Sequence, residues 1–438
     1  MQKGLRMPSR RDLLQTLIAL GPMAVMATPA MRSVASTLAA SPIPPGAAAS
    51  DEDFWTTVQQ AFAVDRTIVN LNNGGVSPSP RTVQDTLRRL TEQANQMPAY
   101  ELWRRQEPQV ETVREGLASM FGVDTEEIAI TRNASESLET LQLGLPLRSG
   151  DEVVTTTQDY PRMLTTWDQR ARRDGIVVRK VRFDVPVRDV RTIVAAIEAA
   201  LTPKTKVIHV SHVVFLTGQI MPVREICRLA RERGIWCIVD GAHSFAHFPF
   251  RQQDLECDFF GTSLHKWLTG PIGTGMLYVK KERIPDVWPL MAAPKESDGN
   301  IRKFEEIGTH SAAVHNALGE ALAFNRALGL ERKATRFRYL HRLWTDRLKR
   351  HEAARFLTDI DDDRNQCGLR LVHIEGTDPV KLSGWLLDKR RIFTVAIVHD
   401  EFKGLRVAPN VYTTPDEIER FADAMEEVVQ GKVSEVKA

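Results

Sequence analysis

The chain has 438 residues, of which 42% are hydrophobic and 26% are charged, a composition that excludes a disordered or fibrous protein. The formal net charge is +2, and acidic and basic residues are interspersed without a basic tail, so nothing indicates a nucleic-acid partner. A chain of this length exceeds what one hydrophobic core usually fills, which predicts two domains.

The N-terminal residues have the pattern of an export signal. Ser9-Arg10-Arg11-Asp12-Leu13-Leu14 places two arginines before a leucine pair, and an apolar, uncharged stretch runs from Leu13 to Ala30. This pattern resembles a twin-arginine (Tat) signal peptide, with Ser33-Val34-Ala35 as a candidate cleavage site. We therefore predict that residues 1–35 direct the protein through the Tat export machinery to the periplasm or another exported location.

The alternatives for this segment are a membrane anchor and a disordered tail. Gln15, Gly21 and Pro22 interrupt the apolar stretch, which is marginal for spanning a bilayer, so we expect no stable membrane anchor. Residues 36–50 are rich in proline and alanine and are predicted to form a linker.

Strand-like apolar runs alternate with helical patterns between residues 51 and 303. This alternation predicts an α/β domain with a largely parallel sheet covered by helices on both faces. The predicted strands are Glu127–Ile130, Glu152–Thr155, Val177–Val181, Lys206–Ser211, Trp236–Asp240 and Gly275–Val279, and two of the helices are Val187–Leu201 and Val223–Arg233.

The pattern changes at about residue 304. A long helical stretch is predicted from Ala313 to about Lys349, followed by strands near Gly368–Ile374 and Ile392–Val398. A last helix is predicted to begin near Thr414-Pro415, with Thr414 as its N-cap. Residues 304–438 are therefore expected to form a smaller α+β domain, which the first residues after 51 can join.

The four cysteines are Cys227, Cys237, Cys257 and Cys367, and no two of them form a CxxC pair. We interpret them as buried free thiols. A metal or redox role is the alternative, and an exported protein could also contain a disulfide.

An acid and a lysine stand where a cofactor would need them. The apolar run Ile235–Val239 ends on Asp240, and Lys266 follows after one more segment. An acid at the carboxyl end of a parallel strand points into the crevice where α/β sheets bind ligands. A nearby lysine can form an imine with an aldehyde, and a carboxylate can keep a pyridine nitrogen protonated. The pair predicts a pyridoxal 5′-phosphate (PLP) enzyme with Lys266 and Asp240 as catalytic residues.

Other interpretations remain open for these residues. Asp240 could cap a strand, and Lys266 could lie on the surface. Asp240, His243 and His247 could ligate the metal of a metal-dependent hydrolase, although no further cluster completes such a site and no metal ligand is expected. The glycines from Gly270 to Gly275 lead into a strand and do not match a dinucleotide fingerprint.

The motif Ser263-x-His265-Lys266-Trp267, the Gly-Pro loop behind it and Asp240-x-x-His243 carry a family resemblance. Over residues 52–428 the chain resembles the PLP-dependent class V aminotransferases of fold type I, in the isopenicillin N epimerase-like branch. The resemblance implies a seven-stranded type of sheet, a Schiff base between PLP and Lys266, and a homodimer with shared active sites.

The resemblance also assigns the residues around the cofactor. Thr309 would reach it from the neighbouring subunit, and Arg406 would bind a substrate carboxylate, for which a planar guanidinium is suited. For Ser135, Tyr160 and Arg406 the structural alternatives are an N-cap, a core ring and a salt bridge. The cofactor-binding residues that the resemblance implies are Asn133, Ala134, Ser135, Tyr160, Asp240, His243, Ser263, His265, Lys266 and Thr309.

The expected activity is that of an aminotransferase acting on an amino acid or an amino-acid-like, peptide-derived compound. Epimerisation at the same carbon is the alternative, and a non-catalytic binding protein is an alternative of another class. The positions of Val214 and Phe215, where many relatives carry an asparagine, are apolar here, and Cys367 leads into a strand. Both departures count against a cysteine desulfurase.

Overall fold

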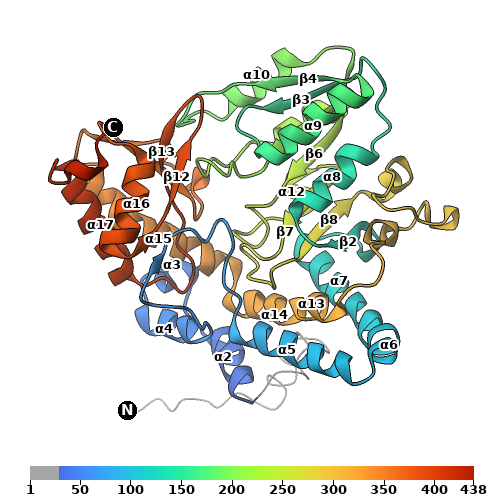
Figure 1. Ribbon diagram of the computed structural model, residues 1–438, viewed down its shortest axis with the longest axis horizontal. Coiled ribbons are helices and arrows are strands. Elements are labelled where there is room, and N and C mark those ends of the chain that lie inside the picture. The colour runs from blue at the N-terminus through green and yellow to red at the C-terminus, as the bar shows by residue number, and fades with distance from the viewer. Residues whose placement is uncertain (1–28) are drawn as a thin grey trace, which may run out of the picture.

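The computed structural model describes residues 29–438, and the twin-arginine motif lies outside this range. The described chain forms two bodies that lie side by side, a larger one in green and yellow and a smaller one in orange and red (Figure 1). The predicted α/β fold with a largely parallel central sheet is confirmed.

The large body is organised around a seven-stranded sheet with the order β2-β8-β7-β6-β5-β3-β4. All neighbouring strands are parallel except at β8, which is antiparallel to both β2 and β7. The strands are β2 (Ile128–Thr131), β3 (Glu152–Thr156), β4 (Val177–Val181), β5 (Thr205–Ser211), β6 (Trp236–Asp240), β7 (Phe259–Ser263) and β8 (Gly275–Val279).

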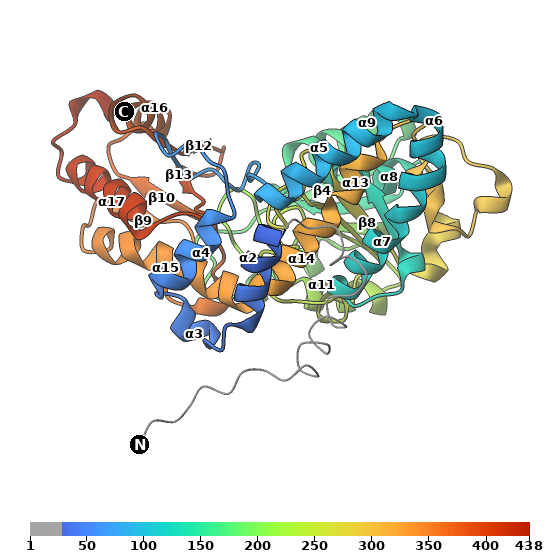
Figure 2. The ribbon, with the colours of Figure 1, turned by 90° about the horizontal axis from the view of Figure 1, so that it is seen from below.

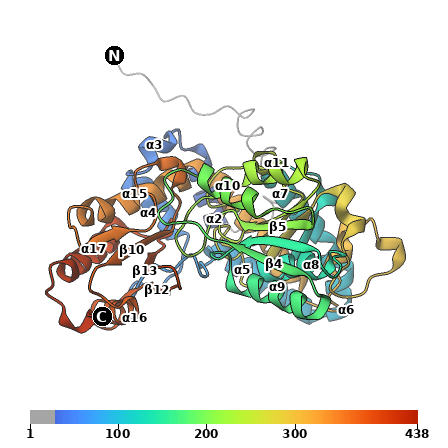
Figure 3. The ribbon, with the colours of Figure 1, turned by 90° about the horizontal axis from the view of Figure 1, so that it is seen from above.

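Helices cover both faces of this sheet. Helices α8 and α9 lie on one face and α10 and α11 on the other (Figure 3). Four of the seven strands are buried along their whole length and two more at all but one residue, as expected for strands sandwiched between helical layers. The helices around the sheet are α5 (Arg81–Gln96), α7 (Glu107–Phe121), α8 (Ala134–Gly144), α9 (Pro161–Asp174), α10 (Arg191–Ala200), α11 (Val223–Glu232) and α12 (Gln252–Leu255).

The small body contains an antiparallel sheet with the order β12-β13-β10-β9. Near the start of the chain, β1 (Val69–Asn70) pairs in parallel with β11 (Ile392–Phe393), so residues that precede the large sheet do join the small body. Its other elements are β9 (Ala354–Phe356), β10 (Arg370–Ile374), β12 (Val395–Val398), β13 (Lys403–Val407), α15 (Leu330–Leu348), α16 (Pro379–Arg390) and α17 (Pro415–Val429).

The expected linker over residues 36–50 is instead largely helical. Helix α2 (Pro29–Ala40) packs on α14 (Leu318–Leu328), and α3 (Pro45–Ala48) packs on α15 (Figure 2). Leu38 and Ala48 are fully buried, and Arg332 donates hydrogen bonds to the carbonyls of Leu38, Ser41 and Ile43. The alanines that suggested a flexible segment are good helix formers, and the buried face decides the outcome. Helix α4 (Glu52–Gln60) follows.

The long helix expected from residue 313 to about 349 is three helices, α13 (Ala312–Asn316), α14 and α15. Gly329, with φ 82°, separates the last two, a conformation that glycine adopts readily. Because α13 and α14 pack on α5 and α7, the smaller body begins near Gly329 instead of at residue 304. The strand expected over 392–398 is likewise divided, into β11 and β12.

None of the helices between residues 29 and 438 combines the length and apolar character that a bilayer crossing requires.

Candidate active site

A cavity of about 520 Å³ opens where the carboxyl ends of the central strands meet the small body. The strands β5, β6 and β7 end on Ser211, Asp240 and Ser263, and all three residues line the cavity. Ligands of open parallel sheets bind at this edge, so the sheet itself positions the polar residues of the site.

Lys266 follows β7 and projects into this cavity, where its Nζ lies 3.0 Å from His243 Nε2. Burial lowers the pKa of Lys266 to about 8, the positive charge of Arg406 acts in the same direction, and the carboxylate of Asp240 opposes them. The amine is therefore far closer to its neutral, nucleophilic form at physiological pH than an exposed lysine.

Asp240 lies at the end of β6 with 6% of its surface exposed. Its Oδ1 accepts a hydrogen bond from the backbone N–H of Ala242 at 2.9 Å, which leaves the second oxygen without a protein partner among residues 29–438. Burial raises the pKa of Asp240 to about 6, against the lowering effects of the Ala242 bond and Lys266. A buried carboxylate with one uncommitted oxygen is suited to bind a cationic N–H group.

His243 lines the same cavity, and burial is the main cause that lowers its pKa well below the usual range. Its Nδ1 is buried without a partner among the described residues. His265 also lines the cavity, but its ring contacts the carbonyl of Thr274 at 3.1 Å. The two histidines therefore offer the cavity neutral rings with different free nitrogens.

The N-terminus of α8 opens onto the cavity. Asn133, not Ser135, is the N-cap, because Asn133 Oδ1 accepts the N–H of Glu136 at 2.8 Å. The N–H of Ala134 donates to Ser263 Oγ at 2.9 Å, whereas the hydroxyl of Ser135 has no protein partner among residues 29–438. A helix N-terminus with a free hydroxyl is a ready anion site.

Tyr160 precedes α9 and lies in the cavity wall. Its ring meets that of Phe215 edge-on at 5.3 Å, and Tyr160 is partly buried against the core that contains Met163, so it both packs on the core and lines the cavity. Beside it, the carboxylate of Asp159 accepts hydrogen bonds from Thr155, Thr156 and Ser211, which joins the ends of β3 and β5.

Arg406 reaches the cavity from β13 of the small body. Its Nη1 donates to the carbonyl of Phe215 at 2.8 Å and its Nη2 to Asn72 Oδ1 at 2.9 Å. No carboxylate among residues 29–438 forms an ion pair with it, so the predicted alternative of a salt bridge is wrong. Burial lowers the pKa of Arg406 to about 10. A desolvated guanidinium held only by neutral acceptors is suited to bind a carboxylate from outside the protein.

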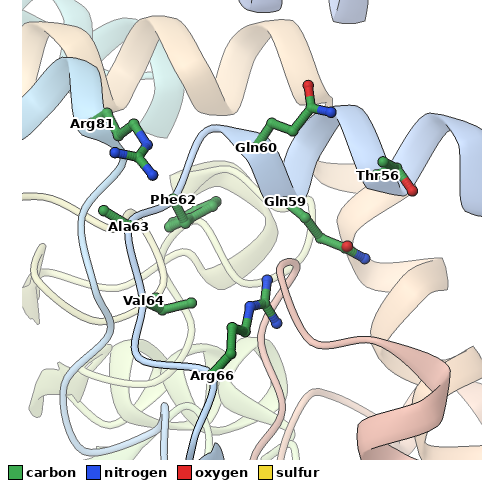
Figure 4. Close-up of a pocket in the computed structure, with 8 residues that line it drawn as sticks. All are labelled: Thr56, Gln59, Gln60, Phe62, Ala63, Val64, Arg66 and Arg81. Atoms are coloured by element: carbon green, nitrogen blue, oxygen red, sulfur yellow. The ribbon is translucent and has the colours of Figure 1, made fainter.

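Thr309 is the one predicted residue that lies elsewhere. It lines a separate cavity with Arg114 and His315, and its assignment to the active site of a neighbouring subunit stays a prediction. A further cavity, bordered by Arg66, Arg81 and Phe62, is shallow (Figure 4). Arg66 there already pairs with Glu417 at 3.0 Å, so this surface lacks the uncommitted buried groups of the Lys266 cavity.

The metal site considered for Asp240, His243 and His247 is not assembled. His247 Nδ1 contacts the carbonyl of His243 at 2.7 Å, and His247 Nε2 accepts the N–H of Gly368 at 2.6 Å. Because both ring nitrogens are used within the protein, His247 has no lone pair to offer a metal. Across residues 29–438, no group of three or more histidines, cysteines or acids is arranged to hold one.

All four cysteines are free and buried in the structure. Burial raises the pKa of Cys367 to about 12, which keeps it a thiol. Cys227 and Cys237 lie with their Sγ atoms 3.0 Å apart in the core, away from the cavity.

Two residues of the site carried no signal in the sequence. Asn72 and Gly74 lie in a loop, and a side chain at Gly74 would meet Leu369 at 2.7 Å. Asn72 is 334 residues from Arg406 along the chain, so only the fold brings the two together.

Known proteins resemble this chain over most of its length. Residues 69–421 match the family described as aminotransferase class-V. The isopenicillin N epimerase of Streptomyces clavuligerus is 30% identical over 85% of this chain and 98% of its own length.

Two solved structures share the fold. The cysteine desulfurase CsdA of Escherichia coli matches with a TM-score of 0.74 at 22% identity, covering 89% of this chain and 99% of its own. A mutant of C-DES, described as having glycine covalently linked to its PLP cofactor, matches with a TM-score of 0.71 at 21% identity, covering 82% of this chain and 96% of its own.

Proposed function

We propose that this chain, which belongs to the aminotransferase class-V family of PLP-dependent enzymes, moves the α-proton of an amino acid or amino-acid-like compound with Lys266. The observation that carries the proposal is the convergence in one cavity of a buried lysine of lowered pKa, a buried carboxylate and an unpaired guanidinium. Surface residues do not produce that combination, and perturbed groups of this kind gather at active sites.

The residues present fit PLP. The free hydroxyl of Ser135 and the N-terminus of α8 suit a phosphate, and a Cβ at Gly275 would lie 2.6 Å from the Asn133 backbone, so the turn that forms this cradle needs glycine. Asp240 would hold the pyridine nitrogen, and the unpartnered Nδ1 of His243 and the ring of Tyr160 line the same space. When bound through Lys266, the cofactor supplies an electron sink for the substrate's α-carbon.

The protein's own groups then perform the remaining work. Arg406 binds and orients the substrate carboxylate, while Asn72 and the Phe215 carbonyl hold the guanidinium in place. The Lys266 amine, of pKa about 8, accepts the α-proton. His243 Nε2, 3.0 Å from Lys266 Nζ, fixes the direction of the amine. The apolar side chains of Val395 and Ile397 border the cavity and exclude water from that side.

Where the proton returns decides the reaction. Return to a cofactor carbon would make the protein an aminotransferase, the activity expected from the sequence. Return to the opposite face of the α-carbon would make it an epimerase, which is favoured by the nearly full-length likeness to isopenicillin N epimerase. A desulfurase reaction is not supported, because the four cysteines are buried and none of them lines the cavity.

The test is to incubate the PLP-loaded protein in D₂O with amino acids and with peptides that have a free amino terminus. NMR should show that the α-hydrogen of the substrate exchanges for deuterium, and the Lys266→Ala variant should not catalyse this exchange. Formation of a keto acid would establish transamination, and formation of the opposite enantiomer would establish epimerisation. Failure of every amino compound to exchange its α-hydrogen, in protein that carries the visible PLP band, would contradict the proposal.

We further propose that the protein is exported folded through the Tat pathway and acts as a homodimer. The twin arginine at Arg10-Arg11 supports the first point. Cleavage after Ala35 would leave the buried Leu38 in the mature protein. Replacing both arginines with lysine should retain the enzyme in the cytoplasm, and N-terminal sequencing of the exported protein should locate the cleavage site. The mass of the loaded protein by sedimentation tests the dimer.

A further inference from the structure

The residue that follows the proposed catalytic lysine is held from two sides by groups with no other evident role. The Trp267 side chain is fully buried, and its carbonyl accepts a hydrogen bond from the Nζ of Lys333, in the first turn of α15. The Trp267 ring stacks on the ring of His247, with centroids 3.6 Å apart and an interplanar angle of 11°.

Lys333 is 1% exposed and forms no ion pair among residues 29–438. Its second hydrogen bond, of 3.0 Å, goes to Asn325 Oδ1, and Asn325 Nδ2 in turn donates to the carbonyl of Leu268 at 2.8 Å. Lys333 and Asn325 thus bind two consecutive carbonyls directly after Lys266. Burial lowers the pKa of Lys333 to about 7, so keeping an ammonium here opposes folding.

His247 connects the same site to the small body. The N–H of Gly368 donates to His247 Nε2, so the ring proton resides on Nδ1 and is donated to the carbonyl of His243. A Cβ at Gly368 would lie 2.7 Å from this Nε2 and 3.1 Å from the Trp267 ring, so the close approach requires glycine. His243, whose carbonyl accepts the bond from His247, is also the residue whose ring contacts Lys266 Nζ.

We infer that Lys333 and His247 are positioning residues for Lys266, which they hold through Trp267 and His243. The turn after Lys266 is closed by the bond from Thr269 N to the Lys266 carbonyl. Movement of Trp267 would therefore displace the Lys266 backbone and withdraw its amine from the buried position beside His243. The link to Gly368 makes that position depend on how the two bodies meet. This inference rests on the proposed role of Lys266.

The test measures Lys266 in the cofactor-free full chain, by competitive amine labelling between pH 6 and 11 and mass spectrometry of the Lys266 peptide. Release of the amine from its buried site should raise its labelling midpoint in Lys333→Met by about one pH unit, towards that of an exposed lysine. His247→Phe, which keeps a stacking ring and loses both hydrogen bonds, should shift the midpoint in the same direction and serves if Lys333→Met does not fold.

The matched control is Lys303→Met. Lys303 is also buried and donates to two backbone carbonyls, those of Ile284 and Asp298, but it does not line the Lys266 cavity. The substitution Lys303→Met should leave the pH midpoint of Lys266 labelling unchanged, even if it lowers the melting temperature. In the PLP-loaded enzyme, Lys333→Met should reduce kcat about tenfold with little change in KM, because a small misplacement of the amine affects the chemical step.

Unchanged Lys266 midpoints in both Lys333→Met and His247→Phe would overturn the positioning role. A shift of equal size in Lys303→Met would overturn it too, since the effect would then be one of general stability. The proposed function fails by a different result, namely a visible PLP band that is the same in wild type and Lys266→Ala.

Discussion

The two walls of the active-site cavity are built in different ways. On the large-domain wall, Asp240 and Ser263 stand at the ends of adjacent strands, and Lys266 follows in the next loop. The sheet fixes Asp240 and Ser263, and Lys266 is held through Trp267 and His243. On the small-domain wall, Arg406 projects from β13 and is held by the Phe215 carbonyl of the large body and by Asn72, which bridges to Ala408 beside β13.

This difference suggests a division of labour. Asp240 and Ser263 keep their geometry as long as the sheet is intact, which suits the cofactor, and Lys266 depends in addition on Lys333 and His247. Arg406 keeps its bond to the Phe215 carbonyl only while the two bodies stay in contact, which suits a group that binds each substrate in turn. Changes in the large-domain wall should therefore act on cofactor attachment and kcat, and changes in the small-domain wall should act on KM.

Lys266→Ala should have the largest effect. Removing the amine that attaches the cofactor and accepts the proton should reduce kcat by more than about a thousandfold. The visible band of the loaded protein should be lost or shifted, and borohydride should no longer fix the cofactor to the chain. Lys280→Ala, at a half-exposed lysine paired with Glu282, is the control and should behave like the wild type. Comparable activity in both variants would place the reaction elsewhere.

Arg406→Lys should have the next largest effect, and it should fall on the other parameter. Lysine keeps the charge but cannot form two parallel hydrogen bonds to a carboxylate, so KM should rise about ten- to a hundredfold. The visible spectrum should be retained. Arg66→Lys, in the separate shallow cavity, should leave KM unchanged. If the visible PLP band is lost together with a rise in KM, the two walls are not independent.

The sequence allowed the large-domain wall to be predicted because its residues are local features of strands. A buried strand ending on Asp240 can be recognised within a few positions, whereas Asn133 and Ser135 at the start of α8 were assigned from the resemblance. The same locality explains why α/β architecture was predictable from alternating patterns. Even there, the bounds of β7 were not predicted, because the second half of Phe259–Ser263 consists of small residues.

The sequence did not predict what depends on contacts between distant segments. Arg406 was assigned from a resemblance, but its acceptor Asn72 is 334 residues away, and no local pattern marks it. The N-terminal helix α2 is another case, since Arg332 binds the Leu38 carbonyl of this helix from 294 positions along the chain. Lys333 is an unremarkable member of a charged helix until its burial is known.

Asp240→Asn should show how much the buried Asp240 carboxylate lowers the free energy of unfolding. Burial raises the pKa of Asp240 from 3.8 to about 6, so the folded state binds more protons than the unfolded state between these values. The free energy of unfolding should therefore fall as the pH rises from about 4 to 6 and then stay level. A shift of this size corresponds to about 3 kcal/mol.

In the cofactor-free protein, Asp240→Asn should remove this fall. The variant should gain stability relative to the wild type at pH 7 and lose the advantage near pH 4, which urea titrations at both pH values can measure. Asp168→Asn, at an exposed carboxylate of α9, is the control and should leave the difference between the two pH values intact. If Asp240→Asn follows the wild type at both pH values, the carboxylate is not buried as a charge in the free protein.

Asn72→Ala should have the smallest effect and is the sharpest test of the small-domain wall. The substitution removes one neutral acceptor from the Arg406 guanidinium without touching the cofactor groups, and a hydrogen bond to a charged group contributes about 1.5–3 kcal/mol at most. Because the Phe215 carbonyl still holds Nη1, the loss should be near the lower end, a rise in KM of about tenfold with kcat and the spectrum unchanged. Asn95→Ala, on the exposed side of α5, is the control. A fall in kcat without a change in KM would mean that Asn72 acts on the Lys266 side of the cavity, and the division between the two walls would not hold.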